Sequence, residues 1–326
     1  MMAVLATLFL SILLCVLYER FARARRIMDT PNERSSHALP TPHGGGVAVL
    51  AAFVPGLVLA AWLYGEWAQP FITLTGCALA LALLGIVDDV RSLSVRWRLL
   101  AYGVVCLFAA VTLLQGVEAE NVFAHPVLVL IAAFAMLWSL NLYNFMDGID
   151  GIAALQAIFI SVSAAFLTWL AGHDASYVRY CLVLAAAHCG FLMWNYPPAR
   201  LFMGDAGSVP TGFLLAALAV LGAVQDQLDP LCWLVLAAVF ITDASWTLGW
   251  RLLTGQNFTQ PHREHAYQRL SRPWKSHLRV ELLLLAINVM WLLPLALAVQ
   301  LWPEYKLFLV FLAYLPLLAG MAKIRR

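Results

Sequence analysis

The sequence predicts an all-α integral membrane protein with about eleven transmembrane helices. Of the 326 residues, 63% are hydrophobic and only 12% are charged, whereas soluble domains carry about 25% charged residues. The apolar residues also gather in runs of roughly 20, the length that crosses a bilayer as a helix. Because no internal repeat, linker or separate soluble domain is visible, we expect residues 1–326 to form a single polytopic domain.

Eleven apolar runs follow one another along the chain. The first has no basic segment before it, which favours a retained span over a cleaved signal. Several later runs contain Gly or Pro, which membrane helices tolerate when their neighbours satisfy the freed backbone groups. All six cysteines lie inside the runs, where they are expected to be small buried apolar residues. The predicted spans are 2–19, 46–64, 71–87, 99–116, 126–143, 152–171, 177–194, 209–224, 231–250, 281–300 and 306–322.

The basic residues predict the orientation of these spans. All but Arg179 and Lys306 of the 20 Lys and Arg residues fall on one set of alternate loops. Cytoplasmic loops carry an excess of Lys and Arg, so we expect an extracytoplasmic N-terminus and a cytoplasmic C-terminus. The predicted protein therefore crosses its membrane many times, with the basic loops in the cytoplasm.

The polar clusters collect in the predicted cytoplasmic loops, at about 20–45, 88–98, 144–151, 195–208 and 251–280. The loops of the other set are short and plain. This segregation predicts an active site at the inner membrane surface, since a structural scaffold does not require acids on one side only.

The stretch "NLYNFMDGIDG" places Asn141, Asn144, Asp147 and Asp150 three residues apart. On a helix, residues three apart are neighbours, so the spacing predicts a polar stripe at the end of a span. A plain solvated helix end is the alternative interpretation. Ionisable groups at membrane depth are functional candidates by default.

Two further acidic positions end or begin spans in the same set of loops. Asp88 and Asp89 are followed by several arginines, including Arg98. The alternative interpretation of this segment is a solvated turn with a cluster of basic residues. Asp205 lies in "FMGDAGS" just before a span, where it could act as a helix N-cap or bind a metal ion.

The five carboxylates Asp88, Asp89, Asp147, Asp150 and Asp205 come from three loops. Oxygen ligands of this kind suit Mg²⁺ or Mn²⁺ better than zinc. With many arginines nearby, they predict metal-assisted phosphoryl transfer on an anionic substrate. Arg263, His265 and Arg269 could add phosphate contacts.

In its motifs, the chain resembles the polyprenyl-phosphate N-acetylhexosamine-1-phosphate transferases (the MraY/WecA superfamily, glycosyltransferase family 4). The matching pieces are "SSHALPTPHGGG", "GIVDDVRSLSVRWRLL", "NLYNFMDGIDGIA", "WNYPPARLFMGDAGS" and "HREHAYQRL", in family order across residues 35–270. The resemblance implies that undecaprenyl phosphate attacks a UDP-N-acetylhexosamine, releasing UMP and leaving undecaprenyl-diphosphate-sugar in the membrane. No nucleic-acid partner is expected, and a homodimer is compatible with the resemblance.

The resemblance also implies roles for individual residues. Asp205 would be the principal Mg²⁺ ligand, and Asp88 and Asp89 would orient or deprotonate the lipid phosphate, with Arg98 beside them. The remaining positions would contact the nucleotide sugar: Asn144, Asp147 and Asp150 in the diphosphate and nucleotide pocket, Asn195 and Phe202 at the uridine, and Arg263 and His265 at the diphosphate. The residues do not settle which aspartate, if any, acts as a base.

Two departures from the family pattern bear on the sugar. Tyr267 stands where relatives often have a second histidine, and His43 where an arginine is common. Both favour an O-antigen or other surface-polysaccharide initiator over a muramoyl-pentapeptide transferase. Two alternatives come from other classes of membrane protein. A cation-coupled transporter predicts acids near the bilayer midplane and an internal repeat, whereas the acids here lie at the ends of the spans and no repeat is visible. A CDP-alcohol phosphotransferase predicts an Ala-Arg pair after Asp-Gly, which "DGIDGIA" lacks.

Overall fold

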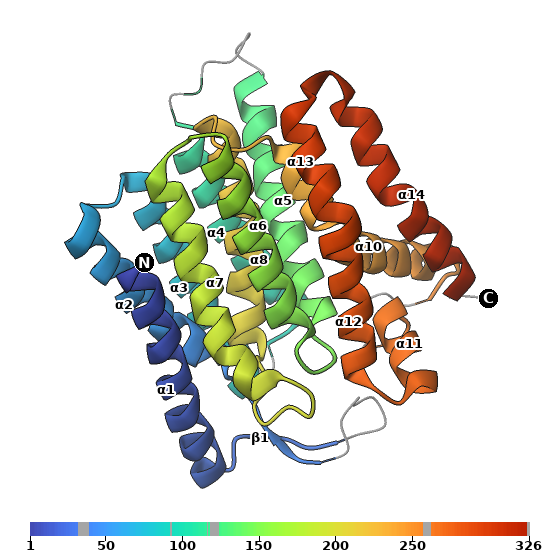
Figure 1. The fold of residues 1–326 in the computed structure, drawn as a ribbon. Coiled ribbons are helices and arrows are strands. Elements are labelled where there is room, and N and C mark those ends of the chain that lie inside the picture. The colour runs from blue at the N-terminus through green and yellow to red at the C-terminus, as the bar shows by residue number, and fades with distance from the viewer. Residues whose placement is uncertain (32–38, 92, 116, 118–123, 257–261, 325–326) are drawn as a thin grey trace.

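The computed structural model describes residues 1–31, 39–91, 93–115, 117, 124–256 and 262–324, and it confirms the all-helical membrane fold (Figure 1). In this part of the chain, ten helices are long and apolar enough to cross a membrane, and one bent pair brings the number to eleven. The predicted span count is therefore confirmed if the bent pair is one span. The predicted orientation of the termini stays a prediction.

The elements follow the chain in the order of the predicted runs. The helices are α1 (Met2–Arg25), α2 (Gly46–Tyr64), α3 (Gln69–Arg91), α4 (Val95–Leu113), α5 (Ala124–Met146), α6 (Ile152–Leu170), α7 (Ala175–Asn195), α8 (Asp205–Val224), α9 (Pro230–Leu236), α10 (Ala238–Leu253), α11 (Ala266–Trp274), α12 (His277–Ile287), α13 (Leu293–Leu301) and α14 (Lys306–Ile324). A π-helical turn, Asn288–Leu292, joins α12 to α13 within one span, and a 3-10 turn, Pro303–Tyr305, precedes α14. Strands β1 (Met28–Asp29) and β2 (Thr41–Pro42) pair antiparallel, with Met28 opposite Pro42.

The predicted span 231–250 is broken. Helices α9 and α10 meet at an angle of 72°, and α10 leaves the bundle sideways toward α14 (Figure 1). The break lies beside a buried polar pair, because Gln156 Nε2 donates to the carbonyl of Leu236 at 3.2 Å and Asn288 Nδ2 donates to Gln156 Oε1 at 2.7 Å. Irregular backbone at membrane depth requires internal partners of this kind.

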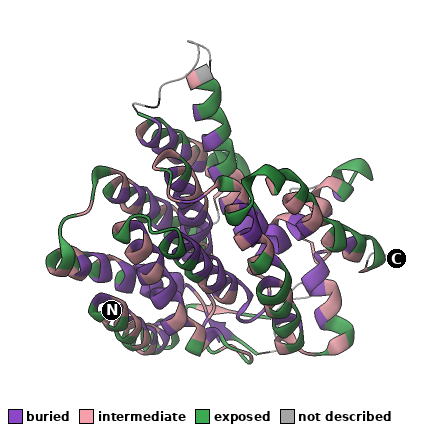
Figure 2. Ribbon diagram, turned by 45° about the horizontal axis from the view of Figure 1, so that its top comes forward, coloured by how far each residue is buried: buried purple, intermediate pink, exposed green. Residues whose placement is uncertain are grey.

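Helices α6 and α8 form the inside of the bundle, with 72% of the residues in the most apolar 18-residue window of each buried, against 11% for α14. Large apolar side chains cover the outside, among them Phe9, Val104, Phe134 and Phe308, each more than 60% exposed. Figure 2 shows buried residues on the parts of the helices that face the middle of the bundle and exposed residues on the outer parts. Such an exterior fits contact with lipid.

Glycines let α2 and α3 approach the beginning of α8 closely. A Cβ on Gly46 would lie 2.1 Å from the Cα of Gly207, and a Cβ on Gly85 would lie 2.7 Å from the carbonyl carbon and oxygen of Asp205. Only a residue without a side chain fits such contacts. The approach at Gly85 brings the end of α3 beside Asp205.

Candidate active site

The described parts of the five predicted loops meet at one end of the bundle, which we call the motif end. Contacts join the end of α3 to the beginnings of α4 and α8, and the loop after α5 to the loop after α7 and to α12. The convergence predicted from the sequence is therefore present. Residues 35–38 of the first motif and 257–261 of the last loop lie outside the described residues.

Arg98 links two of the predicted acids. Its Nη1 donates to Asp88 Oδ2 at 2.5 Å and to Asp205 Oδ2 at 3.3 Å. The other oxygen of Asp88 accepts the backbone N–H of Leu93 at 2.7 Å. Asp88 and Asp205 thus contact the same nitrogen of one guanidinium group, although they are 117 positions apart in the sequence.

Asp89 lies on the other side of the same helix end. Its carboxylate is placed against the backbone N–H groups of Asp205 and Ala206, at the start of α8. Helix N-termini favour negative charge. The Nε2 of His43 is 3.5 Å from Asp89 Oδ1, so His43 lies at the acid pair rather than in a distant loop.

Asp205 does not act as a helix N-cap. Gly204 precedes α8, and Asp205 is the first helical residue. Its carboxylate accepts from Arg98 and, at 3.4 Å, from Asn144 Nδ2, while Ser208 Oγ donates to Asn144 Oδ1 at 2.7 Å. The side chain therefore points into the cluster.

The predicted stripe on one helix is wrong. Helix α5 ends at Met146, so Asp147 and Asp150 lie in the connection to α6. The connection needs the left-handed backbone of Gly151, at φ +74°, which is a conformation that favours glycine. Asn141 turns back to the carbonyl of Leu137 and takes no part in the cluster.

Asp147 faces the other acids. Burial, followed by the nearby carboxylates of Asp205, Asp150 and Asp89, raises the pKa of Asp147 to about 7. We call Asp88, Asp89, Asp147 and Asp205 the aspartate cluster. A carboxyl with a pKa near neutral can take up or release a proton under physiological conditions.

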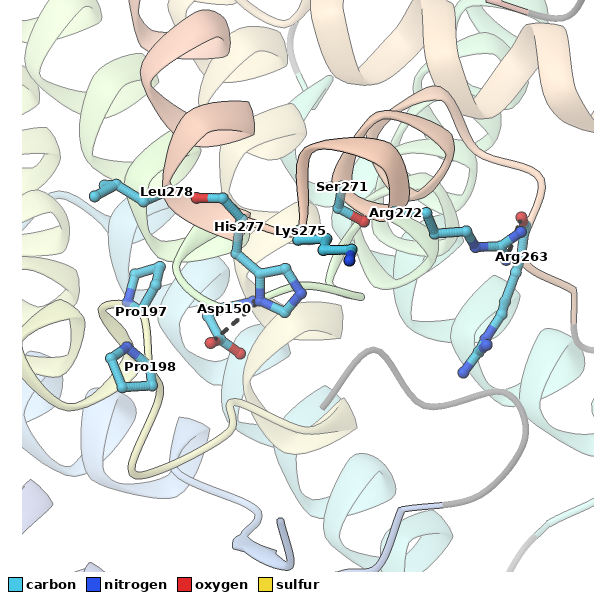
Figure 3. A pocket seen from close by; sticks show the side chains of 10 residues that line it. Asp150, Pro197, Pro198, Arg263, Ser271, Arg272, Lys275, His277 and Leu278 are labelled. Atoms are coloured by element: carbon cyan, nitrogen blue, oxygen red, sulfur yellow. Dashed lines mark hydrogen bonds and ion pairs between the residues drawn. The ribbon is translucent and has the colours of Figure 1, made fainter. Parts of the chain in front are cut away.

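Asp150 points toward His277 at the beginning of α12 (Figure 3). Its Oδ2 accepts the backbone N–H of Ala199 at 3.1 Å and lies 3.2 Å from Nδ1 of His277. Sequence analysis missed His277. Its position inside the predicted loop 251–280 was the one signal available, because the residue lies in an otherwise ordinary basic segment.

Asn195 and Phe202 lie close to these loops. Asn195 is 1% exposed; its Oδ1 accepts the N–H of Gly151 at 2.9 Å and its Nδ2 donates to the carbonyl of Leu201 at 3.0 Å. Phe202 is half-buried and joins β2 through its backbone. Asn195 thus fixes the loop that carries Asp150, and contact of either residue with uridine stays a prediction.

His265 is held by Asp243, a residue that sequence analysis missed. Asp243 lies on α10 and is 4% exposed. Its carboxylate pairs with His265 Nδ1 at 3.1 Å and accepts the backbone N–H groups of Ala266 and Tyr267 at 2.9 and 3.1 Å. An acid inside an apolar span was the available signal. Tyr267 donates its hydroxyl to the carbonyl of Phe145 at 3.0 Å, so the last loop is fastened to the end of α5.

The aspartate cluster fits a hard divalent cation. The four carboxylates lie near one another and only Asp88 and Asp205 contact a guanidinium, that of Arg98. Partly buried like charges require a counter-ion. All these ligand atoms are oxygens, as Mg²⁺ and Mn²⁺ prefer. Among the described residues, no three His, Cys, Asp or Glu side chains form a metal site by themselves. Mg²⁺ is commonly held by one or two carboxylates together with substrate phosphates, so Asp205 as a metal ligand stays a prediction.

Comparison with known proteins decides the family. A model of glycosyl transferase family 4 matches residues 71–223. A probable undecaprenyl-phosphate N-acetylglucosaminyl 1-phosphate transferase of Bacillus subtilis is 28% identical over 287 residues, which are 84% of this chain and 78% of the relative. A decaprenyl-phosphate N-acetylglucosaminephosphotransferase of Mycobacterium tuberculosis is 30% identical over 290 residues, covering 78% of this chain and 71% of that protein. The chain belongs to glycosyl transferase family 4.

The family 4 match spans α3 to α8, the helices that carry the aspartate cluster. A phospho-N-acetylmuramoyl-pentapeptide-transferase of Neisseria meningitidis is also similar, at 27% identity over 276 residues, 72% of this chain and 74% of the relative. The predicted resemblance is therefore confirmed, and the relatives are named for different sugar groups, N-acetylglucosamine and N-acetylmuramoyl-pentapeptide.

Proposed function

We propose that the protein transfers an N-acetylhexosamine 1-phosphate from a UDP-sugar to undecaprenyl phosphate, as the first membrane step of O-antigen or related surface-glycan synthesis. The observation that carries this proposal is the aspartate cluster, joined by Arg98 at the ends of α3 and α8. It occurs in a family 4 chain whose relatives are named as transferases to polyprenyl phosphates.

The reaction joins two anions. An oxygen of undecaprenyl phosphate forms a bond to the sugar-linked phosphorus, and the bond from that phosphorus to the bridging oxygen breaks, so that UMP leaves with the electron pair. A phosphate monoester already carries a charge of about −1.5 to −2 at pH 7. The main task of the protein is therefore to align the two phosphates and neutralise their charge.

The residues of the motif end suit this task. Asp205, with Asp89 beside it, would hold Mg²⁺ or Mn²⁺, which supplies neutralisation of phosphate oxygens when bound. Arg98 offers the planar donors that recognise phosphate. Asp88 and Asp89 would orient or deprotonate the lipid phosphate, and the raised pKa of Asp147, about 7, supports a role for its carboxylate in accepting that proton.

Tyr267 and His43 support a surface-glycan initiator over a muramoyl-pentapeptide transferase. The phenol of Tyr267 is bound to the carbonyl of Phe145 and cannot give the diphosphate the cationic contact of a protonated histidine. His43 contacts Asp89 with an imidazole, which is a weaker phosphate ligand than a guanidinium. Both differences lie at the motif end, where a nucleotide sugar would bind.

The deciding experiment uses the purified full chain with undecaprenyl phosphate, Mg²⁺ and one donor at a time. UMP and lipid-linked sugar are measured with UDP-N-acetylglucosamine, UDP-N-acetylgalactosamine and UDP-N-acetylmuramoyl-pentapeptide. We expect products with at least one of the first two. Products from the pentapeptide donor alone would assign the protein to peptidoglycan synthesis, and absence of UMP with every donor would overturn the proposal.

We also propose that the motif end faces the cytoplasm of a bacterial inner membrane. Arg200 lies in a motif loop with a 64% exposed side chain, whereas Lys306 begins α14 and is 43% exposed. A membrane-impermeant thiol reagent should label Lys306→Cys in intact spheroplasts and Arg200→Cys only after permeabilisation. The reverse pattern would contradict this orientation.

A further inference from the structure

Glu19 is a buried acid of α1 that lies outside all the predicted motifs. It is 7% exposed and precedes the last residue of the helix, Arg25, by six positions. The stripe of α1 that holds it is buried at every fourth position, and the earlier members of the stripe are small: Ala3, Thr7, Ser11 and Cys15. Glu19 is thus the first long side chain of the stripe, and it lies beside the end of α7.

The carboxylate of Glu19 divides its contacts between its own helix and a distant loop. Its Oε1 accepts from Nε and Nη2 of Arg23 at 3.1 and 3.0 Å. Its Oε2 accepts from the indole Nε1 of Trp194 at 2.9 Å and from Nη2 of Arg200 at 3.3 Å. Because the side chain of Arg200 is 64% exposed, solvent screens its ion pair. The bond from the half-buried indole is therefore the stronger contact with the loop.

Trp194 and Arg200 form the neck of the loop that joins α7 to α8. The backbone N–H of Arg200 donates to the carbonyl of Trp194 at 2.7 Å and closes this neck. Asn195 comes directly after Trp194, and Phe202 comes two residues after Arg200. Glu19 therefore holds the neck beside both residues that are predicted to contact uridine.

The same end of α1 also supports the segment that pairs with Phe202. The backbone N–H of Phe202 donates to the carbonyl of Pro42, in β2, at 2.8 Å. The hydroxyl of Tyr18 donates to the carbonyl of His43 at 3.2 Å. Two neighbouring residues of α1, Tyr18 and Glu19, therefore fasten the two segments that meet at Phe202.

The contact between α1 and α7 does not explain why an acid is present. Farther along the two helices, Ser11 Oγ donates to the carbonyl of Ala187 at 2.6 Å, and a Cβ on Gly190 would lie 2.5 Å from the Cβ of Ser11. The helices are thus already in close contact. Burying a carboxylate costs free energy unless it is paired, so an apolar residue would hold the helices with less cost. What the carboxylate of Glu19 adds is its contact with the loop.

We propose that Glu19 is a positioning residue for the nucleotide. Through Trp194 and Arg200 it holds the loop between α7 and α8 in the arrangement that binds uridine, and it does not itself touch the substrate. This inference rests on the proposed function, in which that loop contacts the nucleotide of the UDP-sugar. Loss of Glu19 should therefore weaken nucleotide binding and leave the aspartate cluster intact.

The first test observes the loop itself, by hydrogen–deuterium exchange of the full chain in detergent. Glu19→Ala should speed exchange in residues 196–203 by about tenfold, the loss expected for one bond to a charged group. Arg23→Ala is the matched control, because Arg23 is 52% exposed and binds the other oxygen of Glu19. The control should exchange like the wild type. Equal exchange in the wild type and Glu19→Ala, or equal increases in the two variants, would overturn the proposal.

Binding and kinetics then test the nucleotide. Glu19→Ala should raise the Kd for UMP and the KM for the UDP-sugar by about tenfold. The kcat and the KM for undecaprenyl phosphate should not change, because close contacts with Gly46 and Gly85 hold the start of α8 separately. Trp194→Phe, which removes the indole donor and keeps an aromatic ring, should have the same effect, and it tests the proposal if Glu19→Ala does not fold.

The outcomes separate this proposal from the proposed function. A fall in kcat with an unchanged KM would show a merely structural role and overturn the proposal, and so would equal binding of UMP by the wild type and both variants. A wild type that binds UMP but releases none from any UDP-sugar would overturn the proposed function alone. A wild type that does not bind UMP would overturn both.

Discussion

Gly85→Ala is expected to separate α3 from α8 and to lower catalysis sharply. A Cβ at this position would lie 2.7 Å from the carbonyl carbon and oxygen of Asp205, whereas ordinary contacts begin at 3.4 Å. These are backbone atoms, which cannot rotate away, so the helices must separate by about 0.7 Å, the difference between those two distances. Overpacking of this kind costs about 1–3 kcal/mol.

The separation moves the ends of both helices, where Asp88, Asp89 and Asp205 meet. Misplacement of catalytic groups by about 1 Å can cost 10²-fold in rate, so we expect UMP release to fall by about 10- to 100-fold. The assay compares kcat of purified Gly85→Ala with Gly76→Ala. Gly76 lies on the same helix and has no atom within 4 Å of its Cβ position, so alanine there should be neutral or stabilising. Equal kcat values for the two variants would refute the reasoning.

Three further predictions concern the motif end. Asp205→Asn should lower UMP release by about 100-fold or more, the scale of one lost electrostatic contact to the reacting groups. Exhaustive chelation should abolish UMP release by the wild type until Mg²⁺ or Mn²⁺ is returned. Full activity in either experiment would refute the metal site. Asp147 ionises near pH 3.8 when unfolded and near pH 7 when folded, so stability should fall as pH rises between these values and UMP release should rise through pH 7. Asp147→Asn should show neither trend in thermal unfolding or rate measurements, and an unchanged pH profile would contradict the role. Asp243→Ala removes the acceptor of two backbone N–H groups and the partner of His265. The free energy of unfolding of this variant should fall by about 3 kcal/mol, the upper range for bonds to a charged group. Unchanged stability in thermal unfolding would show that contacts other than those of Asp243 hold the start of α11.

The sequence predicted which residues come together, because each motif lies at the end of an apolar run and alternate run ends share one side of a membrane. Asp88, Arg98, Asn144 and Asp205 meet for this reason. The close approach that completes their contact depends on Gly85, whose importance is visible only when the neighbouring backbone is known.

The local geometry was less predictable. Asp147 and Asp150 have helical spacing, but the chain leaves the helix after Met146, since Asn195 and Glu281 occupy the surroundings of Gly151. Asp243 lies in a run apolar enough to be taken as a continuous span. Asp243 can hold His265 because the chain bends after α9. At this bend, Gln156 of α6 contacts the carbonyl of Leu236. Interactions between distant segments decide such features, and periodicity within one segment does not report them.

The short connection from Asp147 to Asp150 links two groups of contacts. Asp147 borders the aspartate cluster, and Asp150, three residues later, contacts His277 on α12. A substitution that shifts this connection moves both carboxylates together, so kinetic effects of changes at Gly148 or Ile149 have to be interpreted as displacement of the whole connection rather than as a loss at either acid.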